Sequence, residues 1–275
     1  MEMDKEHYLI NKLSSKYIGD DAAVVGDRIY SMDAFFEDTH FKRTWMSMAQ
    51  IGRKAMLVNL SDAIAMNAEP QYALVTVSLP QEMTTKQIDE LTGSLERTAK
   101  EYGCEIIGGD TVAGDKLHLS ITIISHSNDP LFRKGLKEGD LLAYTGTLGE
   151  SRRDLDRLFN GERIADDSRF FEPILRQEFI RKARPFLNAG MDISDGLYCD
   201  TNKLVDINEY GFKILKTIND NIGFSGEEYE MLVGFSREHL QTHEEIAKAC
   251  GTTLTVFAEV ADNSERFPCK SHHFN

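Results

Sequence analysis

Acidic side chains at the ends of apolar segments are the residues of this sequence best suited to do chemistry. Each lies beside glycine or another small residue rather than in a polar run: Asp20 and Asp21 in YIGDDAAVV, Asp33 in SMDAFF, Asp62 in NLSDAIAM, Asp110 in IIGGDTVAG, Asp192 and Asp195 in MDISDGL, and Glu227 and Glu228 in FSGEEYEML. An ionised carboxylate in apolar surroundings costs several kcal/mol unless it is paired or bound to a cation. Most lysines and arginines fall elsewhere, so ion pairing alone is an incomplete explanation.

The glycines beside these acids let a ligand approach the backbone closely. A set of oxygen ligands favours Mg²⁺, which keeps water molecules and bridges to phosphates. The chain has 31 basic and 45 acidic residues, and its net charge of −14 would repel an anionic substrate unless cations mediate. The pattern predicts a metal-dependent enzyme that acts on phosphates. For Asp62 and Asp195 the alternative is a structural role as helix caps.

Length and composition describe an ordinary globular protein. The 275 residues correspond to about two domains, and 41% hydrophobic with 28% charged residues gives no disordered or fibrous bias. The acidic balance argues against a nucleic-acid-binding protein and against a polybasic membrane anchor. The polar N-terminus MEMDKEHYLI is unlike a signal peptide, and no apolar run is long enough for a membrane helix, so we expect a cytoplasmic location.

The cysteines and two histidines are given structural interpretations. Cys104, Cys199, Cys250 and Cys269 contain no C-x-x-C pair, and we expect four reduced, mostly buried thiols. His239 and His243 are four residues apart, but HLQTH lacks the glutamate of H-E-x-x-H, and we expect them on a solvated helix face. Walker A, dinucleotide-binding and protein-kinase motifs are absent from the sequence.

The elements that must position the acids follow from periodicity and breakers. In the first half, we expect strands within 22–36, 72–80, 104–107 and 117–125, and helices over 48–67 and 84–102. In the second half, we expect strands near 141–146, 191–193, 212–216, 229–235 and 253–260, and helices near 150–160, 172–183, 194–207 and 237–249. The polar stretch 126–140 separates two α+β domains, residues 1–130 and 131–275.

Taken together, the acidic motifs resemble those of the thiamine-monophosphate kinases, a family of the AIR-synthetase-like (PurM-like) superfamily. The similar segments occur in the family's order and cover most of the chain to about residue 235: IGDDAAVV, SMDAFFEDTHF, IGRKAMLVNLSDAIAMNAEPQYALVTVSLP, IIGGDTVAG, GDLLAYTGTLGES, MDISDGL and SGEEYEML. The resemblance implies ATP-dependent, Mg²⁺-assisted phosphorylation of thiamine monophosphate to thiamine diphosphate. It also implies a two-domain α+β fold whose N-terminal domains pair through their sheets in a homodimer.

The resemblance implies a role for individual residues. For metal binding, it implies Asp21, Ser31, Asp33, Asp62, Asp110, Asp192 and Asp195. For the nucleotide, it implies Gly109, Asp110, Arg133 and Ser194, and for the substrate His40, Glu227 and Phe274. Structural alternatives are a core position for His40, a linker charge for Arg133 and a tail position for Phe274.

The sequence also departs from the family pattern. Met32 stands where a threonine is common, Arg152, Arg153 and Asp154 follow GTLGES where small residues are usual, and GEEYE replaces GEDYE. The region between MDISDGL and GEEYE, and the whole chain, are short for the family. Rival interpretations are a related ATP-dependent enzyme with another small acceptor and an inactive nucleotide-binding relative. A selenide-phosphorylating enzyme would need a reactive cysteine near the N-terminus, where the chain has none, and a hydrogenase-maturation relative would need a C-terminal cysteine in its own motif.

Overall fold

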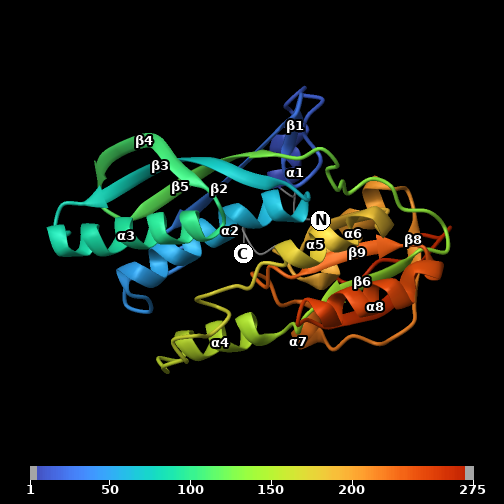
Figure 1. The fold of residues 1–275 in the computed structure, drawn as a ribbon. Coiled ribbons are helices and arrows are strands. Elements are labelled where there is room, and N and C mark those ends of the chain that lie inside the picture. The colour runs from blue at the N-terminus through green and yellow to red at the C-terminus, as the bar shows by residue number, and fades with distance from the viewer. Residues whose placement is uncertain (1–4, 270–275) are drawn as a thin grey trace.

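Residues 5–269, which the computed structural model describes, form two five-stranded sheets (Figure 1). The first sheet has the order β1-β2-β5-β3-β4, and the second has the order β7-β9-β6-β10-β8. All strands of the first sheet precede residue 127, and all strands of the second follow residue 140. The predicted α+β class is confirmed.

The N-terminal sheet is covered by helices on one face only. Its elements are α1 (Lys5–Ile10), β1 (Ala23–Val25), β2 (Arg28–Phe36), α2 (Met48–Ala65), β3 (Glu69–Pro80), α3 (Thr85–Glu101), β4 (Glu105–Gly114) and β5 (His118–His126). Along β5, the residues Leu119, Ile121 and Ile123 are buried while their neighbours are only half-buried. This alternation is that of a strand with one face against a core. Helices α2 and α3 lie on that face (Figure 1).

Helix α2 is the central element of the molecule. A capping box starts it, because the Ser47 hydroxyl accepts a hydrogen bond from the backbone of Gln50 while the Gln50 side chain accepts one from the backbone of Ser47. Nearly all of its residues are buried, as the sequence predicted. The helix contacts both β2 of the first sheet and β7 of the second, so residues on it can serve both halves.

The C-terminal sheet is covered on both faces. Its elements are β6 (Leu141–Thr145), α4 (Glu150–Phe159), α5 (Gln177–Ala183), η1 (Arg184–Phe186), β7 (Ala189–Asp192), α6 (Leu197–Ile207), β8 (Gly211–Ile214), α7 (Asp220–Gly223), β9 (Met231–Phe235), η2 (Arg237–His239), α8 (Leu240–Ala249) and β10 (Leu254–Ala261). Every residue of β6 and β9 is buried. Helices α5 and α8 pack on one face and α6 on the other, which explains these continuous apolar runs.

One segment of the C-terminal half belongs to the N-terminal core. Residues 160–176, the connection from α4 to α5, run back along the first sheet's helices (Figure 1). Phe170, Phe171 and Leu175 from this connection are buried in the same core cluster as α2 and β5. This strap, residues 160–176, joins the two halves of the molecule.

Several local expectations need correction. The Gly108-Gly109-Asp110 sequence lies inside β4 rather than after a short strand. Helix α5 starts at Gln177, later than predicted. His243 is fully buried against Phe235 and Phe186 instead of facing solvent, because α8 turns this side toward the sheet. Within residues 5–269, no helix is long and apolar enough to cross a membrane.

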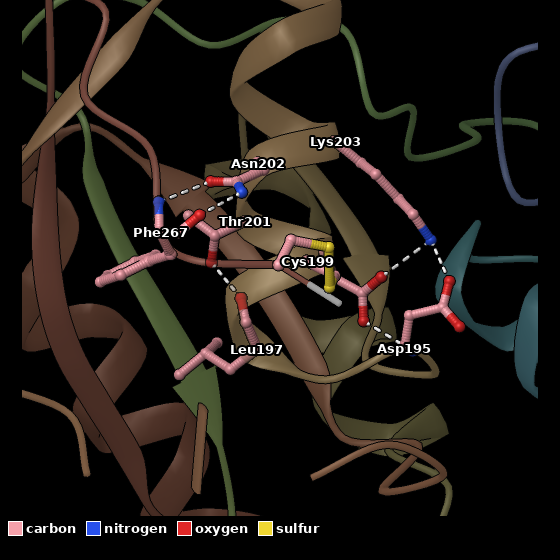
Figure 2. The surroundings of a disulfide bond; sticks show 9 residues. Asp195, Leu197, Cys199, Thr201, Asn202, Lys203 and Phe267 are labelled. Carbon is pink, nitrogen blue, oxygen red and sulfur yellow. Dashed lines mark hydrogen bonds and ion pairs between the residues drawn. A yellow bond between two sulfur atoms is a disulfide. The ribbon is translucent and has the colours of Figure 1, made fainter. Parts of the chain in front are cut away.

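The expectation of four free thiols is wrong. Cys199 of α6 and Cys269 form a disulfide with their Cα atoms 5.0 Å apart, whereas Cys104 and Cys250 are free. The partners are 70 residues apart, so their spacing gave no signal. Tertiary packing brings them together: the Phe267 ring stacks on Tyr198, and the backbone of Phe267 makes two hydrogen bonds of 2.9 Å with the Asn202 side chain (Figure 2).

Candidate functional site

Four of the predicted metal-binding carboxylates are brought to one place by α2. Asp62 lies in the last turn of α2, Asp33 lies on β2, Asp192 ends β7, and Asp21 precedes β1. The helix packs against both β2 and β7. Acids from four segments of the sequence therefore share one region between the two sheets. The helix-cap alternative for Asp62 is wrong, because Ser47 caps α2.

The pKa values of these carboxylates show that they influence one another. Burial raises the pKa of Asp62 well above its usual value, and the negative charges of Asp33, Asp192 and Asp21 raise it further. Burial, and then the charge of Asp21, raises the pKa of Asp192 to about 8. Burial also raises the pKa of Asp21. The region therefore holds more buried negative charge than the protein itself compensates.

Arg133 supplies part of the compensation. Its Nε donates to Asp21 Oδ1 at 2.9 Å, and its backbone N–H donates to Asp20 Oδ1 at 2.7 Å. Its positive charge lowers the pKa of Asp62 and Asp192, but burial outweighs this effect in both cases. Arg133 is thus a partly buried member of the carboxylate region, and its interpretation as a linker charge is wrong.

The donor set fits a divalent cation that keeps other ligands. The side chains are hard oxygen donors, as Mg²⁺ requires, and their raised pKa values indicate charge that a cation would offset. Across the described chain, no three His, Cys, Asp or Glu side chains converge into a ready-made metal cage. Mg²⁺ does not need one, because it retains waters and is completed by substrate phosphates. Asp192 is held by a hydrogen bond from the Ser61 hydroxyl.

The alternation along β2 separates Asp33 from Met32. Asp33 influences Asp62 on α2, and its backbone N–H donates to the Asn59 side chain of α2 at 2.8 Å. Met32 points to the opposite face of the strand and is 65% exposed. The methionine therefore takes no ligand position beside Asp33. The hydroxyl of Ser31 is buried and donates to the Asn59 carbonyl at 3.4 Å.

Gly109 and Asp110 are not brought to this region. Asp110 pairs in register with Thr76 on the outer, exposed face of the sheet, away from α2. Its side chain accepts a hydrogen bond from the backbone of Thr111 at 2.9 Å. A Cβ at Gly109 would meet the Val75 carbonyl oxygen at 1.8 Å, so glycine is needed for the pairing of β4 with β3. Within a single chain, Asp110 and Asp33 therefore lie on opposite faces of the sheet.

Backbone hydrogen bonds join the loop before α6 to the loop before β9. Glu227 donates its backbone N–H to the Ser194 carbonyl at 2.7 Å, and Tyr229 donates to Ile193 at 2.9 Å. Both Glu227 and Tyr229 have left-handed backbones, with φ of 55° and 52°. Non-glycine residues with left-handed backbone conformations are strained, and they concentrate at functional sites. The MDISDGL and GEEYE motifs thus form one unit.

Asp195 and Glu228 occupy different environments in this unit. The Asp195 carboxylate forms an ion pair with Lys203, and Lys203 also pairs with the buried Asp200 at 3.2 Å (Figure 2). The cap of α6 is Gly196, so the cap alternative for Asp195 is wrong. Glu228 accepts hydrogen bonds from the backbone of Gly149 at 2.7 Å and of Ser151 at the start of α4. It holds the GTLGES turn in place.

Two predicted substrate contacts flank one aromatic ring. His40 is half-buried, stacks on Phe35 at 5.8 Å between ring centroids, and accepts a hydrogen bond from the Phe36 backbone at its Nδ1. The Lys54 Nζ lies 5.8 Å from the centroid of the same Phe35 ring and pairs with Glu227 at 2.5 Å. His40 and Glu227 therefore approach the same place from opposite halves of the chain. Phe274 lies outside the described residues.

Sequence reasoning missed three residues of this region. Tyr229 lies among the carboxylates, and burial together with Glu227, Asp33, Asp192 and Asp62 raises its pKa well above the ordinary value, so its hydroxyl stays protonated. Lys54 and Asp200 are fully buried charged residues. The signal for Lys54 and Asp200 is their place in apolar or small-residue runs, GRKAML and LYCDT, the same kind of position that the acids of the recognised motifs occupy.

Residues 19–126 match the family described as AIR synthase related protein, N-terminal domain. The chain is 30% identical to a thiamine-monophosphate kinase of Aquifex aeolicus, over 86% of this chain and 83% of the relative. It is 28% identical to one of Bacillus subtilis, over 90% and 86%. A solved structure described as AaThiL complexed with AMPPCP and TMP has a TM-score of 0.85 at 24% identity, covering 97% of this chain and 94% of that chain.

The two sheets and the carboxylates between them define an α+β, PurM-like protein of the AIR synthase-related class, as the resemblance implied. Within that class, similarity over most of both chains is decisive. The chain belongs to the thiamine-monophosphate kinase family.

Proposed function

We propose that the chain transfers a phosphoryl group from ATP to thiamine monophosphate, giving thiamine diphosphate, with Mg²⁺ bound among Asp21, Asp33, Asp62 and Asp192. The observation that carries the metal site is the raised pKa of Asp21, Asp62 and Asp192, whose burial outweighs the positive charge of Arg133. Membership of the thiamine-monophosphate kinase family supports these substrates, and so does the similar structure of AaThiL complexed with AMPPCP and TMP.

The acceptor chemistry asks little of the protein in proton transfer. A phosphate monoester has a second pKa near 6, so its oxygen is already ionised and nucleophilic at pH 7. The difficulty is to bring two polyanions together, and positioning with charge stabilisation supplies most of the catalysis of such transfers. Asp21, Asp33, Asp62 and Asp192 would hold Mg²⁺, which would supply positive charge to offset that of the phosphates. No general base is therefore assigned, and His40 is given an orienting role.

Other residues of the chain take positioning roles in this proposal. Arg133, anchored by Asp20 and Asp21, offers a cation to the phosphates of the nucleotide. Ser194 and Asp195 lie in the bonded loop pair at the start of α6 and are proposed to hold nucleotide and metal. His40, which stacks on Phe35, and Glu227, which pairs with Lys54, are proposed to contact the organic part of thiamine monophosphate.

Turnover tests the proposal directly. Purified protein with ATP, MgCl₂ and thiamine monophosphate is expected to form thiamine diphosphate and ADP in equal amounts, measured by chromatography. EDTA is expected to abolish the reaction, and unphosphorylated thiamine is expected to give no product. Thiamine diphosphate at background level with Mg²⁺ present would refute the assignment.

The outer face of the N-terminal sheet supports a homodimer. Large apolar side chains are exposed on or beside this helix-free face: Tyr30, Met32, Tyr72, Leu74, Ile107 and Val112. Exposed apolar patches of this kind mark interaction sites. We propose that a second copy packs on this face. The side chain of Asp110 lies on the same face, so it would then serve the site of the other copy.

A complementation experiment separates the two placements of Asp110. If it acts across the dimer, mixing Asp62→Asn and Asp110→Asn proteins under subunit exchange is expected to restore activity that neither has alone. The mixed dimer then contains one site with both carboxylates. No recovery in mixed dimers verified by mass spectrometry would place Asp110 in its own chain's site or in none. Sedimentation of the parent as a 31.1 kDa monomer would contradict the dimer itself.

A further inference from the structure

Lys54 is a buried cation to which the proposed chemistry assigns no role. It lies in α2, its residue is 0% exposed, and its Nζ pairs with Glu227 Oε2 at 2.5 Å. Burying a charged group is strongly unfavourable unless partners replace its water. A lysine that only filled space in the core would be replaced by methionine at no such cost, so the charge itself requires an explanation.

Aromatic rings complete the surroundings of this ammonium. The Phe170 ring lies 3.7 Å from Nζ, measured to the ring centroid, and Phe35 lies at 5.8 Å. A cation over the face of a desolvated aromatic ring is attracted by the negative charge density of that face. Phe170 comes from the strap, whose Ser168 hydroxyl donates to Asp154 of α4 at 2.6 Å. The strap therefore supplies the nearer aromatic contact of Lys54, and Glu227 supplies its ionic contact.

Glu227 is held from two directions. Its backbone, in the left-handed region, donates to Ser194, and its Oε2 is bound by Lys54. Within residues 5–269, Oε1 of Glu227 accepts no hydrogen bond, and the side chain keeps 29% exposure. A carboxylate with one oxygen fixed and the other open is oriented to accept a hydrogen bond from a ligand.

We propose that Lys54 is a positioning residue for substrate recognition: it fixes Glu227 so that the open oxygen meets the organic part of thiamine monophosphate, and Phe170 of the strap holds Lys54 in place. The inference rests on the proposed function, in which Glu227 contacts that substrate. By neutralising one oxygen, Lys54 also makes Glu227 an oriented acceptor for a hydrogen-bond donor rather than a free counterion for any cation.

The test compares Lys54→Met, Glu227→Gln and the double variant in steady-state kinetics. Lys54→Met is expected to raise KM for thiamine monophosphate about tenfold, with kcat changed less than about threefold. KM for ATP is expected to stay at the parent value. The double variant is expected to match Glu227→Gln alone, because both changes remove one interaction.

Arg53→Met provides the matched control. Arg53 is the neighbouring cation on α2 and pairs at 2.7 Å with Glu172 of the strap, but it does not contact Glu227. It is expected to lower the melting temperature without changing KM for thiamine monophosphate. An equal KM increase in Arg53→Met would show that loosening the strap suffices, and would overturn the role of Lys54.

The remaining outcomes are also decisive. The inference is overturned if Lys54→Met leaves KM for thiamine monophosphate unchanged. It is also overturned if the KM increases of Lys54→Met and Glu227→Gln multiply in the double variant. In both cases, turnover by the parent protein leaves the proposed function intact. Absence of parent turnover refutes the proposed function and the inference with it. If Lys54→Met does not fold, Phe170→Leu is expected to raise the same KM by a smaller factor, and an unchanged KM there overturns the inference.

Discussion

Two regions of the molecule bury acidic side chains, and they treat them in opposite ways. Glu230 is fully buried, and both of its oxygens are bound: Arg176 Nε and the Thr145 hydroxyl donate to Oε2, and Arg169 donates to Oε1, each at 2.6 Å. In the other region, Asp62 is surrounded mainly by further carboxylates. Within the described residues no hydrogen bond to its side chain is formed.

The difference separates scaffold from site. The charge of Glu230 is compensated, because two guanidinium groups and a hydroxyl bind its oxygens, as a buried structural carboxylate requires. The carboxylates around Asp62 leave charge uncompensated, and strongly perturbed acids of this kind cluster at functional sites. The two regions therefore differ in whether the negative charge of the buried acids is compensated, and not in burial itself. Substitutions in each region can test this difference.

The largest expected effect is on turnover at Asp62. Asp62→Asn removes a charge that the site needs for metal and is expected to lower kcat by about two to three orders of magnitude or more. The metal-free variant is expected to be more stable than the parent, because the raised pKa of Asp62 shows that its charge is unfavourable in the folded state. Kinetics and chemical denaturation measure both. Little loss of activity would remove Asp62 from the site.

Glu230→Gln is expected to produce the opposite pattern. Removing this charge leaves Arg169 and Arg176 buried without a full partner, which costs about 3–5 kcal/mol of unfolding free energy. Once folded, the variant is expected to keep its KM for thiamine monophosphate, measured well below its lowered melting temperature. A stable variant with impaired turnover would reverse the assignment of scaffold and site.

The pH dependence of stability sharpens the contrast. The pKa of Asp192 is about 8 in the folded protein against 3.8 ordinarily, so the folded state binds more protons between these values. Unfolding free energy of the metal-free protein is therefore expected to fall as pH rises from about 4 to 8, by at most about 1.4 kcal/mol per pH unit from this group. Denaturation of parent and Asp192→Asn in EDTA gives the difference.

The slope difference between these two proteins reports Asp192 together with its effect on Asp62, whose pKa the charge of Asp192 raises. Excess Mg²⁺ is expected to reduce that difference, since a bound cation favours the ionised carboxylate. Parent and Asp192→Asn with parallel pH profiles in EDTA would show that this acid is compensated in the folded state.

The smallest expected effect concerns His40, at the edge of the site. His40→Gln is expected to raise KM for thiamine monophosphate by a factor of about five and to change kcat less, because an orienting contact acts on ground and transition states alike. The kcat of the variant is expected to keep the parent's pH dependence between about pH 7 and 9, above the phosphate pKa. Loss of a kcat ionisation near 6.5 in the variant would make His40 a proton-transfer residue.

Periodicity predicted most elements because local patterns report burial on one face. Helices α2, α3 and α6 and nearly every strand lie where alternation or 3.6-residue spacing placed them. Helix α5 was predicted too long, because the apolar residues Phe170, Phe171 and Leu175 before it pack on the N-terminal core in an irregular strap. A local pattern cannot tell which distant surface an apolar residue covers.

The candidate site was predicted in its residue types and only partly in its membership. Acids beside glycines in apolar runs identified Asp21, Asp33, Asp62 and Asp192, which the structure gathers. The same pattern could not show that Asp110 faces away from them, because register and strand order decide which face a residue occupies. Met32, a doubtful ligand position from sequence, lies on that other face too.

Most helices and strands, and the chemical type of the site, follow from the sequence alone, because both depend on neighbours in the chain. Which charges meet depends on tertiary packing. Lys54 and Glu227 are far apart in sequence, and so are Cys199 and Cys269, yet each pair is in contact. The cost of a buried charge depends on every group packed around it, and those groups come from elements that sequence spacing does not relate.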